Sequence, residues 1–333
     1  GLDRGSDIPR CPVGAAMLWP SWLRVALARR RWRNEQDSLR ELLIQEDDNL
    51  AWTPSSSSTD GRRVLRLIGG LDISFFCDGG NPNDDRACAA FIVCEFDEAR
   101  ENMTVVWQDF IFIRMTEPYI PGFLAFREAP HYCAMLAKLR AERPELLPDV
   151  VIVDGNGVLH PRGFGVASHV GVLAGLCTVG VAKNLHTIDG LDRTAVQELC
   201  AQAPPETAIP LVGASGRTWG AAVVPLPRKQ AGMKRAMKAP KNPIFVSVGH
   251  RVGLATSVEV IKLCSLSARV PEPQRLADVL SREKVRLARA DEERLIVARG
   301  GARRPLWPVL ATVVNLGVAV AICVRLRTRR SLT

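Results

Sequence analysis

Apolar residues in the middle of the chain form short runs that predict strands, separated by stretches with helical spacing. The run Val150–Val153 holds four β-branched residues between turn residues, which is typical of a strand buried on both faces. It ends at Asp154, before a glycine-rich turn. A second run, Thr178–Ala182, follows after a helix-length connection and ends at Lys183. The pattern predicts a βαβ unit with Asp154 and Lys183 at one edge of a sheet, where open α/β sheets bind ligands. The alternative is that Asp154 only caps the following helix, as in an ordinary α/β protein without a site there.

Three earlier apolar runs predict an antiparallel meander of strands: 64–76, 87–96 and 104–114. Asp72 lies inside the first run, where a carboxylate is disfavoured. It requires a cation or hydrogen bonds, because a buried carboxylate without them is costly. A helix predicted from about Phe123 to Ala141 carries Glu128.

The second half of the chain alternates short apolar runs with helical spacing. Strands are predicted at 209–212, 218–224 and 244–248, and helices in the middle of 187–205, at 254–266 and from about Gln274. The last strand leads into His250. Six Lys or Arg residues and no acid lie between Pro225 and Asn242. This stretch is either an exposed loop or a flap that contacts phosphates, and the sequence leaves both open.

The two ends of the chain differ from its middle. Residues 1–31 are predicted to be a poorly ordered extension, and Trp32–Glu46 an amphipathic helix outside the sheet. The globular domain is predicted at 32–285, followed by a basic helical linker at 286–305, an apolar segment at 306–324 and a basic tail at 325–333. The apolar segment carries no charge over about one bilayer-spanning length of roughly 20 residues. It is interpreted as a membrane tail, a peripheral helix or a disordered terminus.

Charge and cysteine content narrow the partners and the compartment. The chain has 333 residues and a net charge of +9, which fits a polyanionic partner. Its nine cysteines are scattered without a CxxC pair, as in an intracellular protein with reduced thiols. We expect a cytoplasmic protein, with the nucleus or nucleolus as the alternative and a possible membrane contact through residues 306–324.

The acidic residues of these elements suit one kind of chemistry. Asp72, Glu128 and Asp154 offer oxygen ligands, and His250 offers a nitrogen. Oxygen-rich sites bind Mg²⁺ or Mn²⁺ rather than Zn²⁺. In a basic protein, such a metal points to phosphodiester hydrolysis, because the metal activates a water and stabilises the developing charge.

Six longer words carry a family resemblance: GGLDISF, PYIPGFLAFRE, VDGNGVLHPRGFGVASHVG, GVAKN, SVGHR and RVPEPQRLAD. Together they resemble the endonuclease V family over roughly residues 32–285. The resemblance implies an α/β, RNase H-like fold with a mixed five-stranded sheet flanked by helices. It also implies cleavage at the second phosphodiester bond 3′ to inosine, leaving a 3′-hydroxyl and a 5′-phosphate.

The resemblance assigns roles to matching residues. Asp72, Glu128 and Asp154 match the metal-binding acids, Lys183 the lysine at the scissile phosphate, and His250 a histidine near a second metal or the attacking water. The residues matched to nucleic-acid binding are a wedge of Pro118, Tyr119, Ile120 and Pro121, the base-pocket positions Gly122, Leu124 and Gly155, and the contacts Arg127, His160 and Arg162.

The predicted activity is a Mg²⁺-dependent endonuclease, with Mn²⁺ as a substitute for Mg²⁺, acting on inosine in single-stranded RNA. The alternative substrate is deoxyinosine in DNA, cut by the same site. A protein group near a 2′-hydroxyl would separate the two, since only RNA has one. The alternative of another class is an inactive nucleic-acid-binding module. It is disfavoured because the three acids, the histidine and the lysine are all present.

Overall fold

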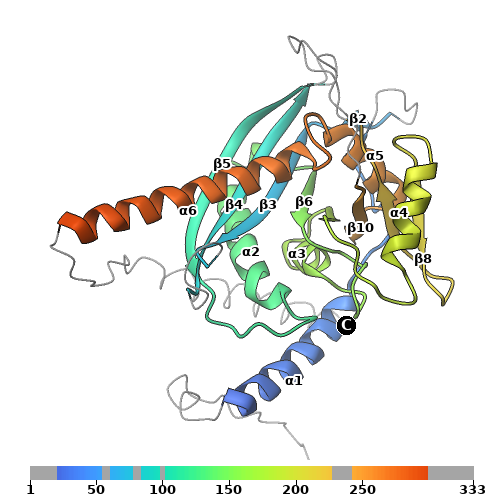
Figure 1. Cartoon of the computed structure of the whole chain (residues 1–333). Helices are drawn as coiled ribbons and strands as arrows, with labels where there is room; N and C mark the ends of the chain where they lie inside the picture. Colours follow the sequence, from blue (N-terminus) through green and yellow to red (C-terminus); the bar gives the residue numbers. More distant parts are fainter. Residues whose placement is uncertain (1–20, 55–60, 78–83, 98–101, 227–241, 299–333) are drawn as a thin grey trace, which may run out of the picture.

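An eight-stranded mixed sheet forms the centre of the protein in the computed structural model, which describes residues 21–54, 61–77, 84–97, 102–226 and 242–298 (Figure 1). Along the sheet the strands are β5 (Asn102–Arg114), β4 (Arg86–Asp97), β3 (Leu67–Phe75), β6 (Val150–Asp154), β7 (Thr178–Ala182), β10 (Ile244–His250), β9 (Thr218–Val223) and β8 (Ala208–Val212). Two short strands, β1 (Trp52–Thr53) and β2 (Arg63–Val64), pair separately.

The strand pairing confirms the predicted antiparallel meander and the predicted βαβ unit. Strands β3, β4 and β5 form the antiparallel meander, and β3, β6 and β7 are parallel neighbours. The sheet is wider than the five strands expected, because β10 adds antiparallel to β7 and is followed by β9 and β8. All seven residues of β10 are buried, so this strand belongs to the interior of the sheet rather than to an edge.

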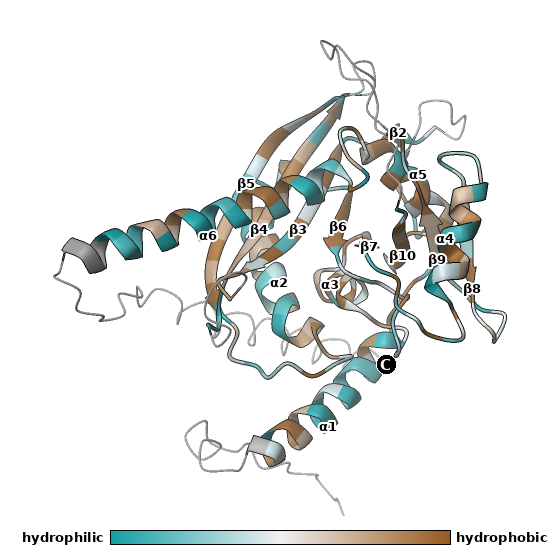
Figure 2. Ribbon diagram, viewed as in Figure 1, coloured by the Kyte–Doolittle hydropathy of each residue, from teal (hydrophilic) through white to brown (hydrophobic). Residues whose placement is uncertain are grey.

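Helices cover both faces of the sheet. Since side chains alternate along a strand, Val151 and Val153 of β6 pack under α2 (Ala125–Glu142) and α3 (Val166–Ala174). Val150 and Ile152 point to the other face, against α5 (Leu254–Cys264). Helix α4 (Arg193–Gln202) covers the β8–β9 end, and a short 3-10 turn, η2 (Pro144–Leu146), precedes β6. Figure 2 shows the strands mostly brown and the outer sides of α4 and α6 mostly teal.

The first helix begins earlier than predicted. Helix α1 spans Ser21–Arg40, so part of the predicted extension 1–31 is helical, and the helix ends before Glu46. Val25 and Ala28 continue the buried stripe of Trp32, at helical spacing, toward the loop before α2. That continuation explains the earlier start. Residues 1–20 lie outside the described residues.

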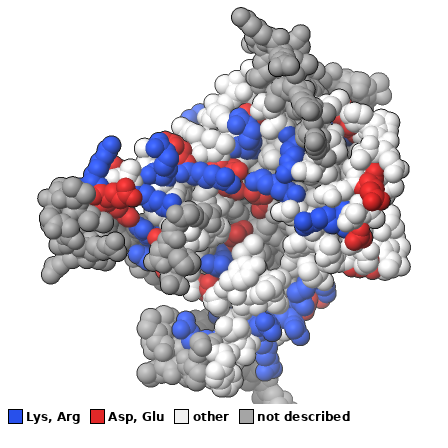
Figure 3. Space-filling model, in the orientation of Figure 1, with Lys and Arg blue, Asp and Glu red and all other residues white. Residues whose placement is uncertain are grey.

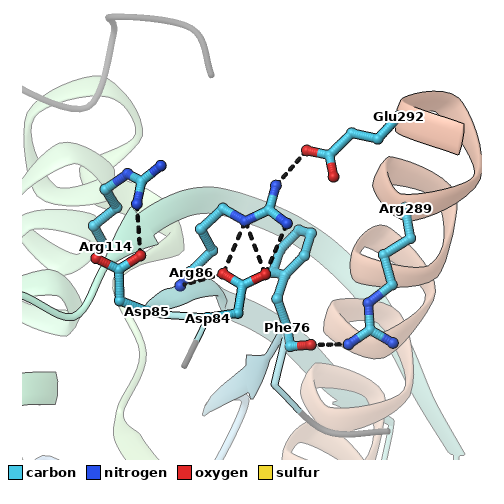
Figure 4. A network of polar contacts seen from close by, with 7 residues as sticks. All are labelled: Phe76, Asp84, Asp85, Arg86, Arg114, Arg289 and Glu292. Atoms are coloured by element: carbon cyan, nitrogen blue, oxygen red, sulfur yellow. Dashed lines mark hydrogen bonds and ion pairs between the residues drawn. The ribbon is translucent and has the colours of Figure 1, made fainter. Parts of the chain in front are cut away.

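The last helix, α6 (Glu272–Ala298), lies across β3 and β4 and extends past them (Figure 1). It runs without a break through residue 286, where a linker was predicted to begin. A polar network holds its second half to the residue after β3 and to the start of β4 (Figure 4). There Arg86 pairs with Asp84 at 2.8 Å and with Glu292 of α6, and Arg289 donates to the Phe76 carbonyl. This attachment fixes the axis of α6 over the sheet.

Among the described residues, no helix combines the length and the apolar character needed to cross a bilayer. The predicted apolar segment 306–324 and the basic stretch 227–241 lie outside those residues. The proposals of a membrane tail and of a phosphate-contacting flap therefore stay predictions.

Candidate active site

The predicted acids meet at the carboxyl ends of the parallel strands. Leu71 of β3 is level with Val153 of β6, so the next residues along, Asp72 and Asp154, lie side by side, and burial and the charge of Asp154 raise the pKa of Asp72. On the next strand, Lys183 follows β7 and places its Nζ 3.3 Å from Asp154 Oδ2. The βαβ prediction thus put the correct pair of residues at this edge of the sheet.

A fourth acid, which the sequence reasoning missed, joins this group from α6. Asp278 Oδ2 lies 3.3 Å from Lys183 Nζ, and its negative charge raises the pKa of Asp72. Ser281, on the same helix, donates to Asp72 Oδ2 at 3.3 Å. The signal was present in the word RVPEPQRLAD, where Asp278 lies in the second turn of a helix that begins at the PEP turn. Only the packing of α6 on β3 shows that this turn faces the other acids.

Carboxylates outnumber nearby cations, and their pKa values show it. Burial, followed by the charge of Asp154, raises the pKa of Glu128 to about 8. Burial and then Asp154 also raise the pKa of Asp72 well above its usual range. Burial lowers the pKa of Lys183, but Asp154 and Asp278 raise it more, so the ammonium stays charged. Excess buried negative charge of this kind needs a cation.

A cleft of about 620 Å³ opens beside these acids. Nine of the predicted site residues line it: Tyr119, Pro121, Gly122, Leu124, Glu128, Asp154, Gly155, His160 and Lys183. Gly155 has a positive φ of +140°, and a Cβ there would meet Val166 Cγ1 at 2.5 Å. Glycine at this position therefore keeps the backbone accessible beside the acids. We call this space the base cleft below.

The predicted wedge divides into an exposed and a buried residue. The Tyr119 side chain is 65% exposed at the rim of the base cleft, with the Arg127 guanidinium 5.9 Å from its ring centre. Ile120 is only 1% exposed and packs with Trp32 and Phe123. The prediction that Ile120 contacts nucleic acid is therefore wrong, because this side chain anchors the loop in the core. Pro118 is half-buried, and neither Pro118 nor Arg127 lines the base cleft.

Two residues of the sequence motif HPRG, at positions 160–163, have different roles: His160 lines the cleft, and Arg162 has a structural role. His160 lines the base cleft, and its Nδ1 accepts from the Arg162 amide at 3.2 Å. Burial, then His186 and Arg162, lower its pKa to about 4, so the neutral ring carries its proton on Nε2 as a donor. Arg162 instead pairs with Asp37 Oδ1 at 2.6 Å and bonds Gln36. In the protein alone, α1 therefore binds its guanidinium, and its contact with nucleic acid stays a prediction.

Two further residues of the base cleft escaped the sequence reasoning. Gln36, on α1, lines it and donates to the Phe164 carbonyl at 2.7 Å. Asn156 also lines it, and its buried Oδ1 has no hydrogen-bond partner among the described residues. A buried acceptor without a partner is costly unless a ligand donates to it. Asn156 lay inside a quoted word, and Gln36 became visible only when α1 packed on the cleft.

His250 is not part of this group. Antiparallel pairing puts it level with Thr178, the first residue of β7, whereas Asp154 is level with Val181. Those positions are three residues apart along β7, roughly 10 Å at 3.3 Å per residue. His250 Nδ1 accepts from the Ile44 amide at 3.2 Å, and the residue is 5% exposed. The predicted catalytic role beside a metal is wrong for this geometry, because strand direction carries His250 to the opposite edge.

The carboxylate oxygens of the active site are ligands that suit a hard cation. In the described ranges, no three His, Cys, Asp or Glu side chains form a ready metal cluster. The Lys183 ammonium bridges Asp154 and Asp278 and stands in for a cation between them. Burial and then Asp154 raise the pKa of Asp72, and with this bridge the oxygen donors of Asp72, Asp154 and Asp278 fit a hard, oxygen-preferring cation.

An α/β sheet that presents several acids and a lysine at its carboxyl edge, beside a cleft, is the arrangement expected of a carboxylate-dependent nuclease. The chain belongs to the Endonuclease V family, whose sequence profile matches residues 49–279. It is accordingly a hydrolytic endonuclease, which confirms the resemblance seen in the sequence and the RNase H-like fold class.

Relatives of known sequence and structure agree with this assignment. Endonuclease V of Homo sapiens is 38% identical over 257 residues, covering 77% of this chain and 82% of the human protein. The mouse protein is 38% identical over 258 residues, covering 77% and 69%. The catalytic domain of human Endonuclease V superposes with a TM-score of 0.66 at 37% identity, covering 79% of this chain and 98% of that one. Ciona intestinalis Endonuclease V, in complex with a 23mer DNA containing an inosine followed by a ribo-adenosine, gives 0.64 at 28% identity, covering 78% and 98%.

Proposed function

We propose that this protein is a Mg²⁺-dependent endonuclease that recognises inosine in single-stranded RNA. It hydrolyses the second phosphodiester bond 3′ to the inosine and leaves a 3′-hydroxyl and a 5′-phosphate. The observation that carries the proposal is the base cleft, because it joins the Tyr119 loop and a glycine-lined wall to the acids in one continuous space. A base taken out of its stack would enter this cleft, within reach of the acids.

The cleft offers polar groups that suit a hypoxanthine ring. His160 Nε2 is a donor, and the buried Oδ1 of Asn156 is an acceptor without a partner among the described residues. Hypoxanthine carries a carbonyl oxygen that accepts and a ring N–H that donates, so both protein groups can be satisfied. Tyr119 at the rim would stack on the neighbouring base and occupy the gap left by the extruded one.

The acids and Lys183 would act on the phosphate. Asp72, Glu128, Asp154 and Asp278 would hold Mg²⁺, and the bound metal supplies positive charge and an activated water. Lys183 keeps its charge between Asp154 and Asp278 and would neutralise the scissile phosphate. Excess negative charge, unfavourable in the metal-free protein, then becomes favourable on binding the metal.

One observation favours RNA over DNA, whereas the charge of the protein fits either nucleic acid. The net charge of +9 suits a polyanion of either kind, and Figure 3 shows Lys and Arg side chains along α6 and over α1 on the visible face. The Ciona relative was captured with a ribonucleotide directly after the inosine. A ribose in that position lies next to the proposed scissile bond. Deoxyinosine in DNA is the second candidate, because the same base would fit the same cleft.

One comparison of substrates tests the proposal. Matched single-stranded oligonucleotides containing inosine in RNA, deoxyinosine in DNA, or adenosine at the same position are incubated with Mg²⁺, with Mn²⁺ and with chelator. We expect cleavage of the inosine RNA one nucleotide beyond the inosine, slower cleavage of the DNA, none of the adenosine control, and none with chelator. Faster cleavage of the DNA would favour the second candidate, and equal cleavage of the adenosine control would refute base recognition.

A further inference from the structure

A second, smaller cleft of about 240 Å³ adjoins the base cleft. Lys183 and Asn184 border both clefts, so the two meet at the lysine proposed to contact the scissile phosphate. The remaining lining residues come from α4, from β10 and the residues just before it, and from the loop before α6: Arg193, Gln197, Asn242, Pro243, Phe245 and Arg269. The second cleft is therefore built from elements that do not contribute to the base cleft.

The side chains of the two clefts differ in charge. The base cleft contains two carboxylates, Glu128 and Asp154. The second cleft is lined by three cations and three side-chain amides, with no carboxylate among its lining residues. Asp192, next to Arg193, accepts from the Ala195 amide at 2.8 Å and so caps α4. Cations together with amide donors are the groups that bind phosphate oxygens.

Arg193 is the cation of this cleft without another partner. Lys183 is shared between Asp154 and Asp278, and Arg269 donates to the Pro243 carbonyl at 3.0 Å. Arg193 is exposed and makes no hydrogen bond or ion pair within the part of the chain that the structure describes. Its five N–H donors are therefore available to a ligand.

We infer that the second cleft binds the phosphate that follows the scissile phosphate on its 3′ side, with Arg193 as its principal contact. The inference rests on the proposed function, because the position of the scissile phosphate defines the next one. Lys183 borders both clefts, so a strand whose base lies in one and whose scissile phosphate lies at Lys183 continues into the other. The ligand is a single phosphodiester group, bound without regard to base sequence.

Two single-stranded inosine RNAs that differ by one phosphate test this. The shorter RNA ends with the nucleoside directly after the scissile phosphate, and the longer one carries one additional 3′-phosphate. We expect the wild-type protein to have about a 3- to 10-fold higher kcat/KM for the longer RNA, as for one charge-assisted contact. This preference should fall close to 1 in Arg193→Gln and increase in Asn184→Lys, which adds a cation to the same cleft.

A matched control is Arg143→Gln, at an exposed arginine before η2 at the opposite edge of the sheet. It should keep the wild-type preference, and melting temperatures should show that all variants fold. An equal preference in wild type and Arg193→Gln, with RNA cleaved normally, would overturn the inference and leave the proposed function standing. Failure of the wild-type protein to cleave either RNA would overturn the proposed function and this inference with it.

Discussion

The two ends of β6 carry carboxylates in opposite situations. Asp149, directly before the strand, accepts from the Arg63 guanidinium and from the amides of Arg66 at 3.0 Å and Leu67 at 3.1 Å. Asp154, at the other end, lies beside the carboxylate of Asp72 and has one lysine nearby. The same residue type on the same strand is satisfied at one edge and in excess negative charge at the other. A satisfied carboxylate stabilises the fold, whereas an unsatisfied group of them indicates a site for a cation.

Replacing Asp149 or Asp154 by asparagine should separate the role in fold stability from the role in metal binding. Asp154→Asn removes a proposed metal ligand without changing shape, so cleavage of inosine RNA should fall by at least about 10³-fold while the melting temperature stays near that of the wild type. Asp149→Asn should lower the free energy of unfolding by about 1–3 kcal/mol, through its weakened hydrogen bonds, and keep kcat. Single-turnover kinetics and denaturation measure the two. Normal cleavage by Asp154→Asn would refute its role as a ligand.

Glu128→Gln should abolish cleavage and stabilise the metal-free protein at neutral pH. The folded-state pKa of Glu128 is raised to about 8 by burial and Asp154. Its protonated form is therefore favoured by folding, so the stability it provides is present below the unfolded pKa of about 4.5 and lost as pH rises through about 8. The amide escapes this loss. At pH 8 in chelator, the variant should be more stable by roughly 3–5 kcal/mol.

Urea denaturation at pH 5 and pH 8 in chelator checks the effect of Glu128. The advantage of the variant should be small at pH 5 and large at pH 8. Glu142→Gln, an exposed position at the end of α2, serves as the control and should show no such pH dependence. A constant difference between wild type and Glu128→Gln across this range would contradict the proposed excess of buried charge.

Asp278→Asn should reduce cleavage by about 10- to 100-fold and raise the Mg²⁺ concentration needed for half-maximal rate. Asp278 shares Lys183 with Asp154, so it influences both the metal site and the lysine. Asp291→Asn, an exposed position on the same helix, should leave the Mg²⁺ titration unchanged. An unaltered titration in Asp278→Asn would limit this residue to holding α6 in place.

Tyr119→Ala should weaken binding of the inosine strand by about 1–3 kcal/mol, the value of one stacked base. Tyr119→Phe keeps the ring and should bind as the wild type does. The neighbouring Ile120→Ala should instead destabilise the fold by about 2–5 kcal/mol, because that side chain is buried. Fluorescence anisotropy and thermal denaturation distinguish the two. Equal affinity in wild type and Tyr119→Ala would make Tyr119 a loop residue only.

Local pattern was sufficient to predict the elements and the acids that follow strands. The runs ending at Asp154 and Lys183 fixed the active edge, because parallel strands end at the same side of a sheet. Asp278, Gln36 and Ile120 were missed or misplaced because their roles depend on which face of a helix or loop packs inward, which local sequence does not specify. The width of the sheet was missed because β10 could pair with β7 only once both were placed in space.

His250 shows most clearly that local sequence does not specify where a residue lies in the fold. Its substitution is expected to have the smallest effect on cleavage. The word SVGHR predicted a catalytic histidine, but the antiparallel direction of β10 carries it to the edge where Asp149 lies rather than that of Asp154. Burial and then Arg251 lower its pKa to about 4, and its Nδ1 accepts from the Ile44 amide. A neutral, satisfied histidine there holds the chain after α1 against the sheet.

His250→Ala should therefore cost roughly 1–3 kcal/mol of stability for a lost hydrogen bond and some packing, while kcat on inosine RNA changes less than about 2-fold. His250→Asn, whose side-chain oxygen can replace Nδ1 as acceptor, should recover part of that stability. The histidine also adds a pH dependence: with a folded pKa below its unfolded value of about 6.5, it stabilises the protein above that pH and loses this contribution as pH falls toward 4. His250→Asn should lack this loss. A large fall in kcat with unchanged stability would instead place His250 in the chemistry, and would mean that the two edges of the sheet act together.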